Sequence, residues 1–117
     1  MTKILIVEDE AGLRQGLEIN LRHENYETAT AADGDEAIRM FHDERPDLVL
    51  LDLMLPKKSG FEVLDHIRKL SKVPVILLTA FGEFRQDFNT WASDAYIVKS
   101  HDTTELKDTV RRLLGEG

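Results

Sequence analysis

The sequence predicts an α/β fold in which a doubly wound, five-stranded parallel sheet carries helices on both faces. Three observations support this prediction. Five short segments have strand character. Four of them are continuous apolar runs, as expected of strands that are buried on both faces. Segments with helical spacing lie between them, and strands that alternate with single helices form parallel sheets covered on both sides.

Most of the predicted strands are rich in Val, Ile or Leu, and the second is the weakest. They cover residues 4–7, 28–32, 48–51, 75–78 and 96–98. Pro46 and Pro74 lie just before the third and fourth strands, where a missing N–H donor does no harm.

Four apolar stripes predict core-facing helices because their members recur at steps of three or four residues. The stripes are Leu13, Leu17 and Leu21; Ala37, Ile38 and Phe41; Phe61, Val63, Leu64, Ile67 and Leu70; and Leu106, Val110, Leu113 and Leu114. A further helix, the fourth in chain order, is expected around residues 84–91, but it is short and poorly patterned. Short polar side chains that can cap backbone N–H groups mark three of the helix starts: Asp33, Ser59 and Asp102.

Length and composition limit the classes of protein to which the chain can belong. Its 117 residues suggest a single domain, and the absence of Cys removes disulfides and thiolate metal sites. With 22 acidic and 15 basic residues, the net charge of −7 disfavours direct binding of nucleic acid or of an anionic membrane surface. No apolar run approaches the roughly 20 residues that span a bilayer, and the N-terminus does not resemble a signal peptide. We therefore expect a soluble, cytoplasmic domain.

Polar and charged residues follow four of the predicted strands, at the sheet edge where ligands of open parallel sheets bind. They are Glu8, Asp9 and Glu10 after the first strand, Asp52 after the third, Thr79 after the fourth and Lys99 after the fifth. Each has an ordinary structural explanation, such as acids at a helix N-terminus or an aspartate in a turn. Their joint position at four strand ends favours a functional site.

The chemistry of this cluster is specific. Carboxylates that are packed together repel one another and need a cation, and an oxygen-only ligand set suits Mg²⁺. A carboxylate can also act as a nucleophile and form an aspartyl phosphate. Lys99 and the hydroxyl of Thr79 could then hold the phosphoryl oxygens.

In combination and order, five pieces of the chain resemble the receiver domain of two-component response regulators, and the resemblance covers essentially all 117 residues. The pieces are ILIVEDE at residues 4–10, LLDLMLP at 50–56, Gly60, LTA at 78–80 and DAYIVK at 94–99. The resemblance implies a flavodoxin-like fold with the strand order 2-1-3-4-5.

The resemblance also implies a role for each site residue. Asp52 would be the phosphoacceptor, and Glu8 and Asp9 would bind Mg²⁺ together with Asp52 and the backbone carbonyl of Met54. The remaining roles are a phosphoryl-binding pair, Thr79 and Lys99, and an aromatic switch residue, Tyr96, that responds together with Thr79.

The function implied is a phosphorylation-dependent signalling switch of the receiver domain at residues 1–117, with no output domain present. A sensor histidine kinase or a phosphotransfer protein would be the phosphodonor. Phosphorylation would change the surface formed by the helix around 84–91, the fifth strand and the last helix, where a downstream protein or a second copy would bind. The chain would not be a conventional enzyme and would catalyse only phosphoryl transfer and autodephosphorylation at Asp52.

Two features depart from the family pattern. Ser100 follows Lys99 where the family usually has proline after a cis bond, and a trans peptide is expected here because a cis bond to a non-proline residue costs about 3–4 kcal/mol. Thr79 and Lys99 are also only 20 positions apart, which favours a short or irregular helix between them.

Other classes of function fit the residues less well. A flavin-binding electron carrier would need a phosphate loop where residues 8–10 are all acidic, and a hydrolase with two aspartates separated by one residue would need an acid in place of Met54. A receiver-like interaction module that is never phosphorylated remains open. The four histidines lack close ligand spacing, and solvated or capping roles are expected for them: His23, His42, His66 and His101.

Overall fold

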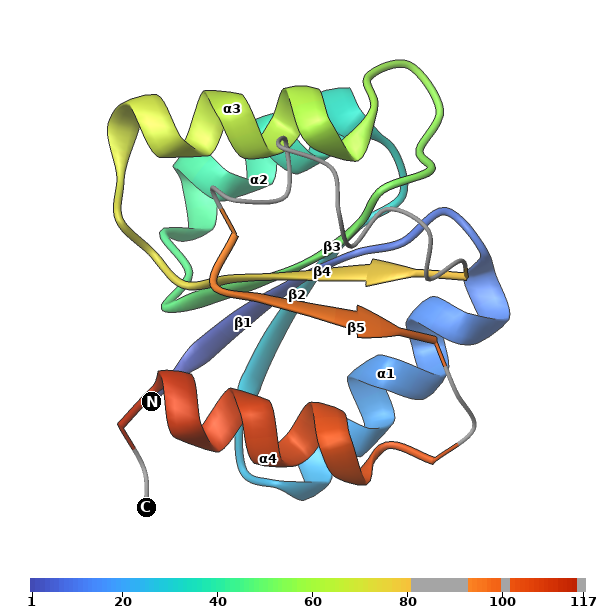
Figure 1. The fold of residues 1–117 in the computed structure, drawn as a ribbon, viewed down its shortest axis with the longest axis vertical. Coiled ribbons are helices and arrows are strands. Elements are labelled where there is room, and N and C mark those ends of the chain that lie inside the picture. Colours follow the sequence, from blue (N-terminus) through green and yellow to red (C-terminus); the bar gives the residue numbers. More distant parts are fainter. Residues whose placement is uncertain (81–92, 100–101, 116–117) are drawn as a thin grey trace.

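The computed structural model of the protein describes residues 1–80, 93–99 and 102–115. It confirms the predicted fold, a parallel sheet in the order β2-β1-β3-β4-β5 with helices on both faces (Figure 1). The strands are β1 (Lys3–Val7), β2 (Glu27–Ala31), β3 (Leu48–Asp52), β4 (Val75–Thr79) and β5 (Ala95–Val98). The described helices are α1 (Ala11–His23), α2 (Gly34–Glu44), α3 (Gly60–Leu70) and α4 (Thr104–Leu113).

The helix named α4 is the last helix that the sequence predicts. The helix expected around residues 84–91 lies outside the described residues.

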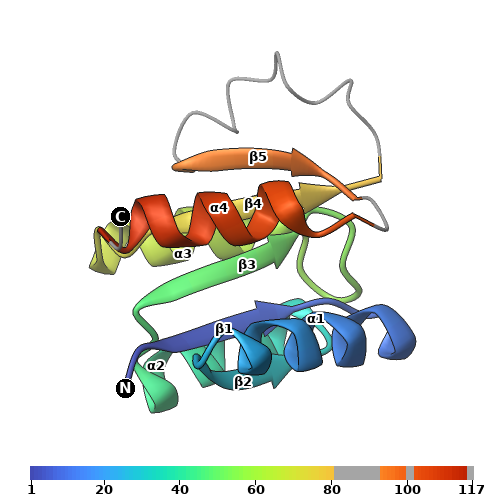
Figure 2. The same cartoon turned by 90° about the horizontal axis from the view of Figure 1, so that it is seen from below.

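The sheet divides the core into two halves (Figures 1 and 2). Helices α2 and α3 cover one face, where Phe41 and Ile67 pack against Leu5 and Leu51. Helices α1 and α4 cover the other face, where Leu21 and Val110 pack against the opposite side of the same strands. The apolar stripes of the four helices therefore face the sheet as their spacing predicts, except for Leu70 at the end of α3, which is 58% exposed.

Position within the sheet explains why some strands are easier to recognise than others. Every residue of β3 and β4 is buried, and so are four of the five residues of β1. Strand β2 lies at an edge and alternates between buried and more exposed positions, so it carries polar residues and a weaker signal.

Side chains cap the starts of the first three helices, and the N-cap of α1 is Glu10. Asp33 accepts a hydrogen bond from the N–H of Glu36, and Ser59 accepts one from the N–H of Glu62, as predicted. At the start of α4, Asp102 Oδ1 accepts from the N–H of Thr104. These contacts fix where each helix leaves the loop that follows a strand. None of the helices within the described ranges is long and apolar enough to cross a bilayer.

Candidate functional site

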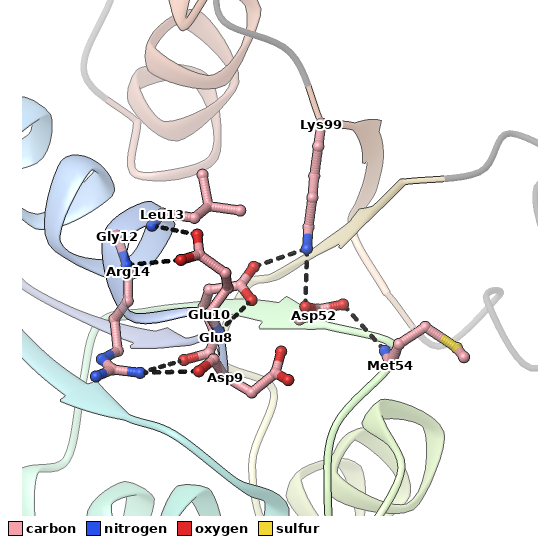
Figure 3. Close-up of polar contacts among 9 residues, drawn as sticks. All are labelled: Glu8, Asp9, Glu10, Gly12, Leu13, Arg14, Asp52, Met54 and Lys99. Carbon is pink, nitrogen blue, oxygen red and sulfur yellow. Dashed lines mark hydrogen bonds and ion pairs between the residues drawn. The ribbon is translucent and has the colours of Figure 1, made fainter.

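Three carboxylates gather where β1 and β3 end, at the carboxyl edge of the sheet (Figure 3). One oxygen from each of Glu8, Asp9 and Asp52 can be chosen so that all three lie within 4.8 Å of one another. Asp52 is the last residue of β3, whereas Glu8 and Asp9 follow β1 directly. Since β1 and β3 are neighbouring parallel strands, their carboxyl ends meet at one edge. The structure thus brings together the acidic residues that the sequence singles out.

Lys99 reaches into this cluster from the end of β5 (Figure 3). Its Nζ donates a hydrogen bond to Asp52 Oδ2 at 2.9 Å and forms an ion pair with Glu8 Oε1 at 2.7 Å. The contact with Glu8 is an ion pair and not a hydrogen bond. One ammonium therefore bridges the acids that follow two different strands.

Burial strengthens the electrostatic interactions among Glu8, Asp52 and Lys99. Glu8 is fully buried and Asp52 is 2% exposed, so water screens their charges little. Burial raises the pKa of Glu8 to about 7, although the adjacent ammonium of Lys99 acts in the opposite direction. For Lys99, burial lowers the pKa, but contacts with Asp52 and Glu8 outweigh that effect and leave the pKa above its ordinary value. The lysine therefore stays charged beside the carboxylates.

Backbone contacts hold the Asp52 carboxylate in place. Its Oδ1 accepts a hydrogen bond from the N–H of Met54 at 3.0 Å. The turn that carries Met54 is itself tied down, since the N–H of Leu53 donates to the carbonyl of Leu78 and the N–H of Gly60 donates to the carbonyl of Leu53. The acceptor oxygens of Asp52 are therefore oriented by the sheet and by the start of α3.

Glu10 has the ordinary role that the sequence allowed for it, an acid at a helix N-terminus, whereas the role of Arg14 was not predicted. Glu10 is the N-cap of α1, and its carboxylate accepts hydrogen bonds from the N–H groups of Gly12 and Leu13. Arg14 donates from Nη1 to the backbone carbonyl of Glu8 at 2.9 Å and to that of Asp9 at 3.4 Å (Figure 3). The role of Arg14 could have been predicted only from its position, five residues after Asp9 at the start of the helix that follows the acids.

The donor set fits a hard divalent cation. Glu8 Oε1 is buried without a hydrogen bond, and the third carboxylate, that of Asp9, belongs to an exposed residue. Opposite ligands of an octahedral Mg²⁺ lie about 4.1 Å apart at ordinary Mg–O distances, so small side-chain shifts would let these oxygens meet one ion. Glu8, Asp9 and Asp52 are the side chains that could hold it.

The two remaining predicted site residues lie on the neighbouring strands. Thr79 is the last residue of β4 and is fully buried, and the N–H of Lys99 donates to its carbonyl at 2.7 Å. Tyr96 is half-buried on β5 and packs against the core half that α2 and α3 cover. Ser100, and with it the expected trans peptide after Lys99, lies outside the described residues.

Comparison with known proteins gives consistent matches. The family model for the response regulator receiver domain matches residues 4–111. The probable transcriptional regulator ycf27 of Guillardia theta is 44% identical over 114 residues, which make up 96% of this chain and 45% of that protein. The chain spans about half the length of the curated relatives that it matches.

Solved structures agree with these sequence matches. The response regulator TrrA of Thermotoga maritima, in complex with Mg²⁺-BeF, is 44% identical with a TM-score of 0.93 and covers 97% of this chain and 99% of its own. In the complex of the histidine kinase ThkA with TrrA, the similar chain is 45% identical with a TM-score of 0.91 and the same coverage. Together with the acidic cluster at the carboxyl edge of the sheet, these matches show that the chain belongs to the response regulator receiver domain family of two-component systems.

Proposed function

We propose that residues 1–117 act as one receiver domain that accepts a phosphoryl group on Asp52, with Mg²⁺ held by Glu8, Asp9, Asp52 and the carbonyl of Met54. The observation that carries this proposal is the position of Lys99, whose ammonium joins Asp52 to Glu8 beside the carboxylate cluster. A nucleophilic carboxylate, a cation site and a fixed ammonium are the groups that phosphoryl transfer needs.

The phosphodonor in this proposal is the phosphohistidine of a sensor histidine kinase or of a phosphotransfer protein. The similar protein TrrA was crystallised with the histidine kinase ThkA, which supports this class of donor. An oxygen of Asp52 attacks phosphorus and forms an O–P bond. The N–P bond of the donor breaks, and the leaving ring nitrogen keeps the electron pair and takes up a proton. Hydrolysis of the acyl phosphate by water later releases inorganic phosphate and restores Asp52.

The residues around Asp52 have separate tasks in this step. Lys99 already contacts Oδ2 and can follow the negative charge onto the phosphoryl oxygens as the bond forms. Thr79, at the end of the next strand, offers a hydroxyl for a second phosphoryl oxygen. A bound Mg²⁺ supplies the positive charge that lets the carboxylates and the phosphoryl group lie close together.

Output in this proposal proceeds through the neighbouring strands. When the Thr79 hydroxyl turns toward the phosphoryl group, it leaves space beside β5, and the half-buried ring of Tyr96 moves further inward. This changes the surface around β5 and α4, where a downstream protein or a second copy binds. A partner responds only if it binds the two states unequally, and couplings of this kind are typically about 1–3 kcal/mol.

The phosphoacceptor is tested by intact mass after incubation with acetyl phosphate and Mg²⁺. We expect a gain of one phosphoryl group that hydroxylamine removes, because hydroxylamine cleaves acyl phosphates and leaves serine and threonine esters intact. Asp52→Asn should show no gain. Asp65→Asn is the matched control, since Asp65 is exposed on α3 and forms an ion pair with Lys69 of the same helix. A hydroxylamine-sensitive gain that persists in Asp52→Asn would exclude Asp52 as the acceptor.

The output path is tested by amide hydrogen exchange with and without beryllofluoride, a stable mimic of the phosphoryl group, at constant Mg²⁺. We expect altered exchange in residues 80–98 and in α4 of the wild type. In Tyr96→Ala, the altered binding of a partner or of a second copy should be lost while phosphorylation continues. A response confined to the residues around Asp52 would contradict this mechanism.

A further inference from the structure

Two histidines that are distant in the sequence meet on the surface of α2 and α3, which lie beside each other on one face of the sheet (Figure 1). His42 belongs to the last turn of α2, and His66 lies within α3, 24 positions further along the chain. Their Nε2 atoms are 3.0 Å apart, and the ring planes meet at 87° with the centroids 5.3 Å apart. The two Nε2 atoms therefore point at each other.

This arrangement differs from the solvated or capping roles that the sequence indicates for these histidines. In a neutral pair, one Nε2–H donates to the lone pair of the other Nε2. His42 is exposed and His66 is half-buried, so solvent and dissolved ions reach the nitrogens. The packing of α2 on α3 keeps the two rings together, because these helices share the core half around Ala37, Phe41 and Ile67.

We propose that His42 and His66 form a bis-imidazole site that binds a divalent transition metal, Cu²⁺ or Ni²⁺. With metal–nitrogen bonds of about 2.0–2.1 Å, two nitrogens 3.0 Å apart subtend an angle of about 91–97° at the metal. That angle matches neighbouring positions of a square or octahedral centre, whereas tetrahedral Zn²⁺ would require the nitrogens to separate to about 3.3 Å. Cu²⁺ and Ni²⁺ favour the former geometry with imidazole ligands.

Binding requires a rearrangement of protons and a rotation of both rings. A ring coordinates the metal through the Nε2 lone pair, so both rings must carry their proton on Nδ1. The ring that donates in the metal-free pair exchanges its Nε2 proton for one on Nδ1 through solvent. Because the two Nε2 atoms face each other head-on in the metal-free pair, each ring must also turn by about 40–45° so that its lone pair points at the shared metal.

The His42–His66 pair is separate from the carboxylate cluster in chemistry and in position. Imidazole nitrogens select borderline transition metals, whereas the oxygens of Glu8, Asp9 and Asp52 suit Mg²⁺. Helix α2 begins after the carboxyl end of β2 and ends just before the amino end of β3, so its last turn lies toward the opposite edge of the sheet. Within residues 1–80, 93–99 and 102–115, no third His, Cys or acidic residue joins the pair in a metal-binding group, so water or an external ligand would complete the coordination.

The proposal is tested by calorimetric titration of the whole chain with Ni²⁺ in buffer that contains saturating Mg²⁺, which keeps the carboxylate cluster filled. We expect one Ni²⁺ per chain, and a loss of affinity of at least about tenfold in His42→Asn and in His66→Asn, because each variant removes half of the chelate. His23→Asn is the matched control, since His23 is exposed in the last turn of α1, outside the pair.

Thermal unfolding provides a second measurement of the same binding. Ni²⁺ should raise the unfolding midpoint of the wild type and of His23→Asn, because a ligand that binds only the folded state stabilises it, and should leave both pair variants unchanged. Absence of Ni²⁺ binding in the wild type would overturn the proposal. Wild-type affinity in either pair variant, or an equal loss in His23→Asn, would overturn it as well.

Discussion

Replacement of Gly60 with alanine should destabilise the domain through a clash at the phosphoacceptor strand. A Cβ atom at position 60 would lie 2.4 Å from the carbonyl oxygen of Asp52 and 2.6 Å from Cα of Leu53. Real Cβ contacts essentially never fall below 3.0 Å, so the start of α3 and the end of β3 must separate by about 0.6 Å. Both obstructing atoms belong to the backbone, so no change of side-chain rotamer can relieve the contact.

The magnitude follows from two opposing effects. Overpacking in a well-packed region lowers the free energy of unfolding by about 1–3 kcal/mol. Alanine has a better helix propensity than glycine by about 1 kcal/mol, which offsets part of this loss. Because both close contacts are with backbone atoms, the upper part of the overpacking range applies, about 2–3 kcal/mol, and we expect Gly60→Ala to be less stable than the wild type by about 1–2 kcal/mol. For a domain of this size that corresponds to a fall of about 4–8 °C in the unfolding midpoint.

Gly16→Ala is the matched control because it makes the same chemical change in the interior of α1, where an added Cβ meets nothing within 4 Å. Only the propensity effect remains there, so this variant should be more stable by about 0.5–1 kcal/mol. Equilibrium unfolding in urea, with extrapolation to water, measures both free energies. Equal stability of Gly60→Ala and the wild type, or a destabilised Gly16→Ala, would refute the reasoning from the added Cβ contacts.

Three further predictions concern the acidic site. Lys99→Met should slow phosphorylation of Asp52 by about 10²-fold, because a fixed charge on the transferring group is lost, whereas Lys107→Met in α4 should phosphorylate at the wild-type rate in the same mass-spectrometric time course. Asp9→Asn should weaken Mg²⁺ binding, measured by calorimetry, and unchanged Mg²⁺ affinity would exclude Asp9 as a ligand. The same variant should raise the free energy of unfolding of the metal-free protein by up to about 1 kcal/mol, because repulsion between the carboxylates decreases. Arg14→Met should lower Mg²⁺ affinity by about tenfold, because the carbonyls of two acidic residues lose their donor, and unchanged affinity would show that Arg14 does not position them.

The sequence was sufficient to locate most of the fold because burial leaves a local signal. Strands buried on both faces read as continuous apolar runs, and the structure extends them mainly by polar end residues such as Lys3, Asp52 and Thr79, which still pair in the sheet. The predicted inclusion of Ala32 in the second strand was wrong. Its N–H donates to the side chain of Glu36 rather than to a neighbouring strand, so the strand ends at Ala31.

The convergence of the acidic residues was also predictable from the sequence, because parallel strands end at a common edge whatever their order. Position after a strand was enough to bring Glu8, Asp9 and Asp52 together. The same argument could not separate Glu10 from its neighbours, since a carboxylate can cap a helix or face the sheet edge from nearly the same position in the chain.

Only the tertiary structure decided which side chains meet across the fold. It placed Lys99 between Glu8 and Asp52, although 47 positions separate the lysine from the aspartate, and it brought His42 to His66 across two helices. The periodicity of apolar residues predicts which side of a strand or helix is buried, because the burial of each residue follows from its position within its own strand or helix. Contacts between distant residues depend on the order in which strands pair and on the rotation of each helix against the sheet, and the free energy of those arrangements is shared among all the segments at once.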